Sequence, residues 1–242
     1  MQVHVINLDR SRARLETFIR LNGARADIVR SPAVDGKLLD RAQLVRDGTI
    51  ADGLNYSAPI LGSAMSHIGL WQKAIAEQMP LTIAEDDAVL AVNFRDEASR
   101  LMGELDWDVI LWGWNFDAFV WTEIPGNVAR AQLKFDQEDL RRNIEIFRTS
   151  PAHSVLMPLK HAFGIMTYSV TPAGARKLLD ACLPLKDELI KFEGYDVAVH
   201  NHTLDAAMNK AYPRMKSFFA IPPLAASEND SSTSINLGNS NA

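Results

Sequence analysis

The sequence has little cysteine, no excess of positive charge and no long apolar run. Its single cysteine, Cys182, excludes an internal disulfide framework and suits a reducing compartment. A formal net charge of −5 argues against nucleic acid as a partner, because phosphate binding needs a basic surface. No stretch approaches the roughly 18 consecutive apolar residues of a transmembrane helix, and the first residues do not resemble a signal peptide. These absences predict a cytoplasmic protein without a transmembrane segment.

Several motifs of common enzyme classes are also absent. The first predicted strand is not followed by Gly-x-Gly-x-x-Gly, and no Gly-Lys-Ser/Thr loop of the Walker type occurs. The sequence contains neither a Cys/His zinc constellation nor a Gly-x-Ser-x-Gly elbow. The chemistries that depend on these motifs therefore have no support.

What is present is enough apolar sequence for one sizeable core, with 47% hydrophobic residues in a chain of 242. Short apolar runs alternate with segments of helical spacing, which predicts an α/β fold with a mostly parallel central sheet. The predicted strands cover 3–8, 28–34, 81–84, 108–112, 163–170 and 215–221. The predicted helices follow Ser11, cover 38–46, 62–78, 94–105 and 204–210, and begin at Thr171-Pro172. Residues 113–150 show no clear pattern.

One domain is expected over residues 1–226, followed by a tail over 227–242. The tail is rich in Ser, Asn and Asp and poor in apolar residues. Such a composition does not offset the entropy lost on ordering, so the tail is predicted to be flexible.

Three adjacent acidic residues, Glu85-Asp86-Asp87, directly follow the apolar strand 81–84. Like charges repel, so this placement costs stability unless a cation compensates. The end of a sheet strand is also where α/β folds bind ligands. Carboxylate oxygens suit Mg²⁺ or Mn²⁺, with diphosphate oxygens completing the shell. The alternative is a solvated acidic turn.

A polar segment, Asn7-Leu8-Asp9-Arg10, joins the first strand to the first helix, and Arg14 follows. Helix N-termini attract phosphate through free backbone N–H groups, and arginines there add charge-assisted hydrogen bonds. The segment is therefore a candidate phosphate site. The alternative is a solvated helix face with Asp9 as its cap.

Histidine offers two further candidates. His67 and Trp71 are four residues apart on one helix and share a face, although a histidine in an apolar stripe is more often a hydrogen-bonded core residue. His200 and His202 lie in a polar segment and could add a nitrogen ligand to a metal, but no spacing rule supports this.

Aromatic residues cluster between 107 and 121, where sugars could stack on them. Trp107 and Trp112 flank a predicted strand and are expected in the core. Trp114 and Trp121 lie in the segment without a clear pattern, and they are the better candidates for substrate contact.

Taken in chain order, these segments resemble glycosyltransferase family 25, the lipooligosaccharide and collagen galactosyltransferase family, over nearly the whole chain. The matching residues are Val5 to Arg10 with Arg14-Leu15, Ala33 to Gly36, Gly62, Ser66-His67, Trp71, Ile83, Glu85 to Asp87, Asp106 to Leu111, Tyr168, Gly174 to Leu179, Leu204-Asp205 and Ser234-Ile235. The resemblance implies a single-domain, Rossmann-like nucleotide-sugar-binding fold of the GT-A type, a divalent metal and usually a UDP-hexose donor.

The chain departs from the family pattern at a few positions. Ile60 stands where an acidic residue is frequent, Ser63 where cysteine is frequent, and Ser227 where glutamine is common. The segment before Asp205 lacks the usual proline. These departures leave donor and acceptor identity open.

The resemblance also implies an inverting hexose transfer, with galactose from UDP-galactose as the expected donor and a glycan or glycolipid such as lipooligosaccharide as the acceptor. Such a role is compatible with peripheral contact at the inner membrane. Glu85 and Asp87 are then predicted to bind Mn²⁺ or Mg²⁺, and Asp205 to act as the base. The predicted donor-binding residues are Asn7, Asp9, Arg10, Arg14, Asp35, Ser66, His67 and Asp86, with Asp86 either structural or bound to the donor ribose.

Three alternatives remain at this point. Asp205 could simply complement the helix dipole. The chain could be a catalytically silent nucleotide-sugar or glycan binding or adhesion module of the same fold. It could also be a metal-dependent phosphohydrolase, for which Asp9 is the only candidate nucleophile at the end of the first strand.

Overall fold

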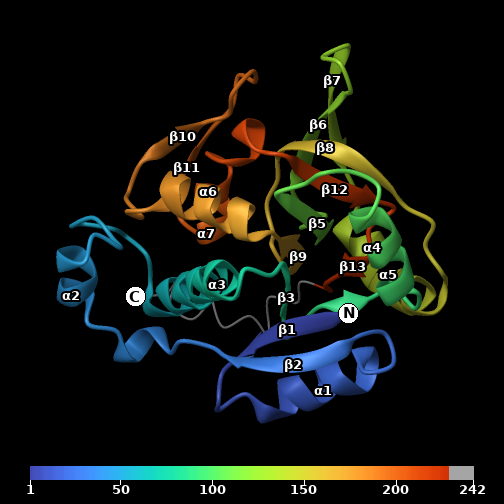
Figure 1. The fold of residues 1–242 in the computed structure, drawn as a ribbon, viewed down its shortest axis with the longest axis horizontal. Helices are drawn as coiled ribbons and strands as arrows, with labels where there is room; N and C mark the ends of the chain where they lie inside the picture. The colour runs from blue at the N-terminus through green and yellow to red at the C-terminus, as the bar shows by residue number, and fades with distance from the viewer. Residues whose placement is uncertain (229–242) are drawn as a thin grey trace.

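The computed structural model of the protein describes residues 1–228, and its centre is one large mixed sheet with helices packed around it (Figure 1). The strands are β1 (Gln2–Asn7), β2 (Asp27–Pro32), β3 (Leu81–Glu85), β4 (Val89–Leu90), β5 (Val109–Gly113), β6 (Phe119–Ile124), β7 (Ala129–Lys134), β8 (Val155–His161), β9 (Thr167–Val170), β10 (Leu189–Lys191), β11 (Ala198–His200), β12 (Ser217–Ile221) and β13 (Ala225–Ala226). The helices are α1 (Arg12–Asn22), α2 (Arg41–Arg46), α3 (Ala58–Glu77), α4 (Phe94–Met102), α5 (Gln137–Thr149), α6 (Pro172–Cys182) and α7 (Leu204–Met208), with 3₁₀ turns η1 (Gly36–Leu38) and η2 (Tyr212–Arg214).

The described part of the sheet has the strand order β2-β1-β3-β9-β5-β12-β8-β6-β7. Within it, the pairs β1–β2, β1–β3 and β5–β12 are parallel, and the other pairs are antiparallel. The predicted mostly parallel order therefore holds for the N-terminal strands but not for the sheet as a whole. A buried apolar run packs equally well in either direction, so its pattern does not encode strand direction.

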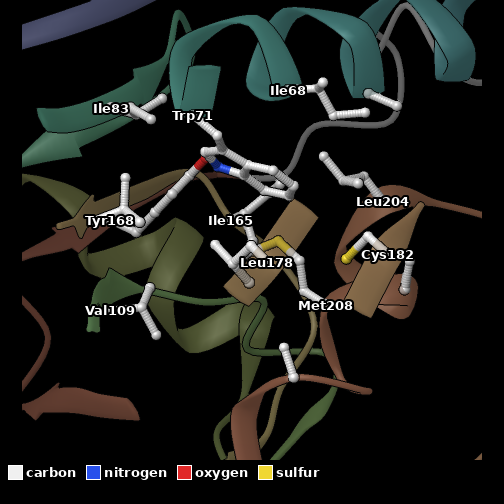
Figure 2. Packing of buried hydrophobic residues seen from close by; sticks show 14 of the residues in the cluster. Ile68, Trp71, Ile83, Val109, Ile165, Tyr168, Leu178, Cys182, Leu204 and Met208 are labelled. Carbon is white, nitrogen blue, oxygen red and sulfur yellow. The ribbon is translucent and has the colours of Figure 1, made fainter. Parts of the chain in front are cut away.

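Both faces of the sheet are apolar. Alternate side chains of a strand point to opposite faces, so a continuous apolar strand contributes to a core on each side. On β5, Val109 and Leu111 belong to one buried cluster, and Ile110 and Trp112 belong to another. The first cluster includes residues of α3, α6 and α7, and the second includes residues of α1 and α4. Figure 2 shows the first cluster, in which Trp71 of α3 lies beside Tyr168 of β9. Helices on both faces make the α/β layering that the alternation predicted.

Residues 113–150, which had no clear pattern in the sequence, form the hairpin β6–β7 and the helix α5. The hairpin pairs with β8 and lies at the end of the sheet. The burial of the tryptophans follows from this arrangement. Trp107 and Trp112 are buried as predicted, but Trp114 and Trp121 are also buried, with 1% and 5% of their surfaces exposed. The expectation that the latter two contact substrate is wrong, because both rings are enclosed by protein, with Phe219 packed edge-on against Trp114 and Phe192 packed edge-on against Trp121.

The tail predicted over 227–242 is described only at its first two residues. Ser227 is buried and Glu228 is exposed. The remainder, including Ser234 and Ile235, lies outside the described residues. Among helices of the described chain, none is long and apolar enough to cross a membrane.

Candidate functional site

A pocket lies where the carboxyl ends of three parallel strands meet. β1 has β2 on one side and β3 on the other, so the chain leaves β1 towards one side and the later connection from β2 to β3 crosses to the other side. Such a switch point opens a crevice at the carboxyl edge of the sheet. The pocket there has a volume of about 140 Å³. It is lined by Ile6, Leu8, Arg10, Arg14, Ala33, Val34, Asp35, Gly36, Lys37, Pro59, Ser63, Ser66, Glu85, Asp86 and Asp87.

Asp86 is held inside the protein by the segment that joins β1 to α1. The Asn7 side chain donates to Asp86 Oδ2 at 2.6 Å, and Arg14 Nε donates to Asp86 Oδ1 at 2.7 Å. Only 9% of the Asp86 side chain is exposed. This carboxylate is therefore neutralised by a side chain of the fold, and of the two roles predicted for Asp86 the contacts favour the structural one.

The opposite wall of this pocket is also charged. Arg10 forms an ion pair with Asp35, whose carboxylate also accepts the Lys37 backbone N–H at 3.1 Å. The Lys37 N–H and the Arg10 guanidinium together lower the pKa of Asp35, so it is ionised at neutral pH. Arg10, Arg14 and Lys37 line the pocket together with the carboxylates of Asp35, Glu85, Asp86 and Asp87. Its cationic residues distinguish it from the pocket described below, and it is called the cationic pocket for that reason.

Ser66 anchors this wall to α3. Its hydroxyl donates to the Gly62 carbonyl at 2.7 Å and accepts the Val34 backbone N–H at 2.9 Å. The hydroxyl thus connects the 33–38 segment to the helix. Ser66 lines the pocket, but its hydroxyl is occupied by contacts of the fold, and its role in donor binding stays a prediction.

A second pocket, of about 200 Å³, adjoins the first at the acidic segment. It shares Ser63, Glu85 and Asp87 with the first pocket. Its other lining residues are Ile60, Asn115, Gly164, Ile165, Met166, Thr203, Leu204, Asp205 and Ser227. Glu85 and Asp87 therefore stand at the junction of a cationic pocket and a pocket that contains Asp205.

Asp205 lies in the first turn of α7 and connects it to the loop between β8 and β9. Gly164 N donates to Asp205 Oδ2 at 2.7 Å, and Ala206 N donates to Oδ1 at 3.0 Å. A carboxylate has about four acceptor positions, so two remain for other groups. The predicted base thus reaches the second pocket while also holding its loop.

The two outer carboxylates of the acidic triplet have different partners. Glu85 Oε1 lies 3.4 Å from His67 Nε2, and Ser227 Oγ donates to Asp87 Oδ2 at 3.1 Å. Asp87 is open to solvent within the pockets but enclosed by protein on its other sides. This enclosure, with the neighbouring Glu85 charge, raises the pKa of Asp87 to about 6. A cation at the junction would relieve the crowded negative charge.

Glu85 and Asp87 fit a divalent cation that is completed by substrate. Within residues 1–228, no group of three or more His, Cys, Asp or Glu side chains is arranged to hold a metal ion alone. Mg²⁺ and similar ions are commonly bound by one or two carboxylates together with substrate phosphates and water. Two carboxylates beside a cationic pocket match that pattern.

Some predicted residues lie elsewhere. Asp9 is exposed, pairs with Arg30 and lines neither pocket. His200 and His202 stack on each other at the end of β11 and also line neither pocket, so neither reaches Glu85 or Asp87 as the proposed nitrogen ligand. His67 is fully buried behind Glu85.

Sequence reasoning missed several residues that the fold brings to the site. Lys37 lines the pocket and directly follows segment 33–36, which matches the family, so its position next to that segment could have identified it. Ser227 was assigned to the tail, and Asn115 lies in a segment without a pattern. The family pattern had marked Ser227 only as a departure from glutamine, and no local signal identifies Asn115. Only the tertiary fold brings the two residues to a pocket that contains Glu85 and Asp87.

A comparison with protein families identifies the family of this chain. Residues 1–195 match glycosyltransferase family 25 (LPS biosynthesis protein). No match is found among curated proteins. A crystal structure described as A197 from STIV aligns with 90% of this chain and 80% of its own, at 8% identity and a TM-score of 0.36, which is too distant to support an argument. Because the family match covers most of the sequence and includes the cationic pocket and the acidic triplet, the chain belongs to glycosyltransferase family 25 and is a glycosyltransferase.

Proposed function

We propose that this glycosyltransferase moves a hexose from a UDP-sugar to a hydroxyl of a glycan or glycolipid, with inversion and with a divalent metal. UDP-galactose is the expected donor and lipooligosaccharide the expected class of acceptor, at the cytoplasmic face of a membrane. The observation that carries the proposal is the junction of two pockets at Glu85 and Asp87. The layered sheet and its switch point also support the finer assignment to a GT-A type of fold.

The donor occupies the cationic pocket in this proposal. Its diphosphate carries negative charge, which Arg10 and Lys37 complement on one wall. Glu85 and Asp87 would repel the same diphosphate. Mn²⁺ or Mg²⁺ between these carboxylates and the phosphates would remove that repulsion and stabilise UDP as a leaving group.

The acceptor occupies the second pocket, which contains Asn115, Thr203 and Asp205 as polar groups. Asp205 takes the proton from the acceptor hydroxyl. The hydroxyl oxygen then bonds to the anomeric carbon from the side opposite UDP, while the bond from that carbon to the phosphate oxygen breaks with its electron pair. This mechanism needs the acceptor beside the donor, and the two pockets share Glu85 and Asp87.

Two competing readings lose support. The phosphohydrolase needs Asp9 as a nucleophile, but Asp9 lines neither pocket and pairs with Arg30. A catalytically silent binding module would need only the donor pocket. It does not account for the second pocket, which contains the Asp205 carboxylate.

Donor hydrolysis and transfer assays test the proposal. The purified protein should release UDP from UDP-galactose slowly in the presence of Mn²⁺, and faster when a glycan acceptor is added. EDTA should abolish both activities. Binding of UDP without any turnover, across a panel of nucleotide sugars and acceptors, would instead support the silent module.

A further inference from the structure

A chain of buried polar groups leads from α3 to Glu85. Trp71 Nε1 donates to the Tyr168 hydroxyl at 2.8 Å, and that hydroxyl lies 3.0 Å from His67 Nδ1. On the other side of the imidazole, His67 Nε2 lies 3.4 Å from Glu85 Oε1. Figure 2 shows the first link, with the Trp71 indole nitrogen facing the Tyr168 oxygen. Trp71, Tyr168 and His67 are each 0% exposed.

The donor and acceptor of each hydrogen bond in this series follow from the indole N–H of Trp71. An indole N–H can only donate, so the Tyr168 hydroxyl accepts from Trp71. The hydroxyl's own hydrogen then points to His67 Nδ1, its other partner in the structure. Nδ1 therefore accepts, and the ring proton resides on Nε2, facing Glu85.

The other arrangements are each penalised. A proton on Nδ1 would leave the buried Tyr168 hydrogen without an acceptor, and an unsatisfied buried donor is unfavourable. A neutral ring protonated on Nδ1 would also direct the Nε2 lone pair at the Glu85 carboxylate. The fold thus selects one tautomer from the side remote from the pocket.

We propose that His67 is a positioning residue, which donates from Nε2 to Glu85 and holds this carboxylate at the junction of the two pockets. The importance of that position rests on the proposed function, in which Glu85 binds the metal. Hydrogen-bonding partners behind a metal ligand fix its orientation. Because His67 is fully buried, it acts on the donor through Glu85 and not by contact, in contrast to the donor-binding role expected from the sequence.

The spectrum of the metal-free protein tests the tautomer directly. Long-range ¹H–¹⁵N correlation of the imidazoles, with His67 assigned from its absence in His67→Gln, should show a protonated Nε2 and an unprotonated Nδ1. In Tyr168→Phe, the His67 Nδ1 resonance should move to the position of a nitrogen without a hydrogen bond. A proton on Nδ1 in the wild type, alone or together with one on Nε2, would overturn the proposal.

Two substitutions of His67 separate its donation to Glu85 from its contact with Tyr168. His67→Gln extends an N–H donor towards the place of Nε2, whereas His67→Asn reaches only to the place of Nδ1. Titration of UDP at fixed Mn²⁺ should show affinity close to wild type for His67→Gln and a loss of about 10- to 100-fold for His67→Asn. Equal losses in both, or none in either, would contradict a positioning role.

Ser169→Ala is the matched control for Tyr168→Phe. Ser169 is the next residue on β9, and its hydroxyl accepts the indole N–H of Trp112 at 2.7 Å. This control removes the acceptor of a buried tryptophan on the other face of the sheet, so it should lower the melting temperature while preserving Mn²⁺-dependent UDP binding. A wild-type protein without such binding would refute the proposed function, and the tautomer would still be decided by the spectrum of the metal-free protein.

Discussion

Gly36 and Gly62 bring the backbones of the 33–38 segment and α3 into direct contact. A Cβ on Gly62 would lie 2.6 Å from the Gly36 nitrogen, and a Cβ on Gly36 would lie 1.7 Å from the Ala58 carbonyl oxygen. Both distances are shorter than any van der Waals contact, so only glycine fits. This close approach places Asp35 and Lys37 on the wall of the cationic pocket.

Gly62→Ala should therefore weaken both the fold and the donor pocket. The added methyl must push the 33–38 segment away from α3, and overpacking of this kind costs about 1–3 kcal/mol of unfolding free energy. UDP affinity should fall with it, because Lys37 moves. Urea unfolding and UDP titration measure the two effects.

Gly69→Ala is the control on the same helix. Its Cβ would meet nothing within 4 Å, and alanine in place of glycine in a helix stabilises by about 0.5–1 kcal/mol. If Gly62→Ala behaved like Gly69→Ala, the close approach would have no energetic importance.

Asp87→Asn should remove the metal dependence of UDP binding and leave the fold intact. The surroundings raise the pKa of Asp87 to about 6, so this carboxylate is mostly ionised at pH 7 but its charge lowers the stability of the metal-free fold. A neutral side chain of the same shape should leave the melting temperature of the metal-free protein unchanged or higher. Calorimetry of UDP with and without Mn²⁺ measures the dependence, and a variant with full Mn²⁺-supported turnover would remove Asp87 from the metal site.

Arg14→Ala and Arg10→Ala should differ in what they damage. Arg14 neutralises a carboxylate of which 9% is exposed, so its loss should lower the unfolding free energy by about 1.5–3 kcal/mol. Arg10 pairs on the surface, and its loss should cost the fold less than about 1 kcal/mol. If Arg10 reaches phosphate, its loss should weaken UDP binding by about 1.5–3 kcal/mol.

Arg12→Ala supplies the comparison, because Arg12 is exposed on the same turn and lines neither pocket. Arg12→Ala should change neither the unfolding free energy nor the affinity for UDP. A UDP affinity that is unchanged in all three variants would place the nucleotide outside the cationic pocket.

Asp205→Asn should lower kcat by about 10²- to 10⁴-fold, the contribution of a general base, with UDP affinity unchanged. A loss of loop structure could imitate this result, because Asp205 accepts from Gly164 N. Asn209→Ala addresses this point, since Asn209 connects to the same loop at the Ala162 backbone and carries no carboxylate. An equal loss of kcat in Asn209→Ala would show that Asp205 only holds the loop.

The local patterns of the sequence were enough to locate most of the elements that form the site. The strand before the acidic triplet is β3, the helix predicted over 62–78 is the greater part of α3, and Thr171-Pro172 begins α6 with the predicted cap at Gly174 N. Apolar periodicity and capping residues act over a few positions, so they can be read without the fold. The same holds for the acidic triplet, whose charge is conspicuous wherever it lies.

The roles of the individual side chains depended on the fold. Asp86 and Asp87 are adjacent in the sequence, yet one pairs with Arg14 and the other faces the junction of the pockets. Similarly, the sequence made Trp114 a candidate for substrate contact, whereas in the fold its side chain is buried.

The sequence by itself determined the alternation of strands and helices, the acidic triplet after β3 and the family to which the chain belongs. The burial of His67 agrees with the core interpretation that its apolar stripe favoured. Only the tertiary structure decided the direction of β9, the contact of His67 with Glu85 and the contact of Ser227 with Asp87. The physical reason is the separation along the sequence of the residues that interact. Propensity and periodicity are properties of neighbouring residues, whereas Ser227 and Asp87 meet across 140 positions of the chain, through packing that no local pattern encodes.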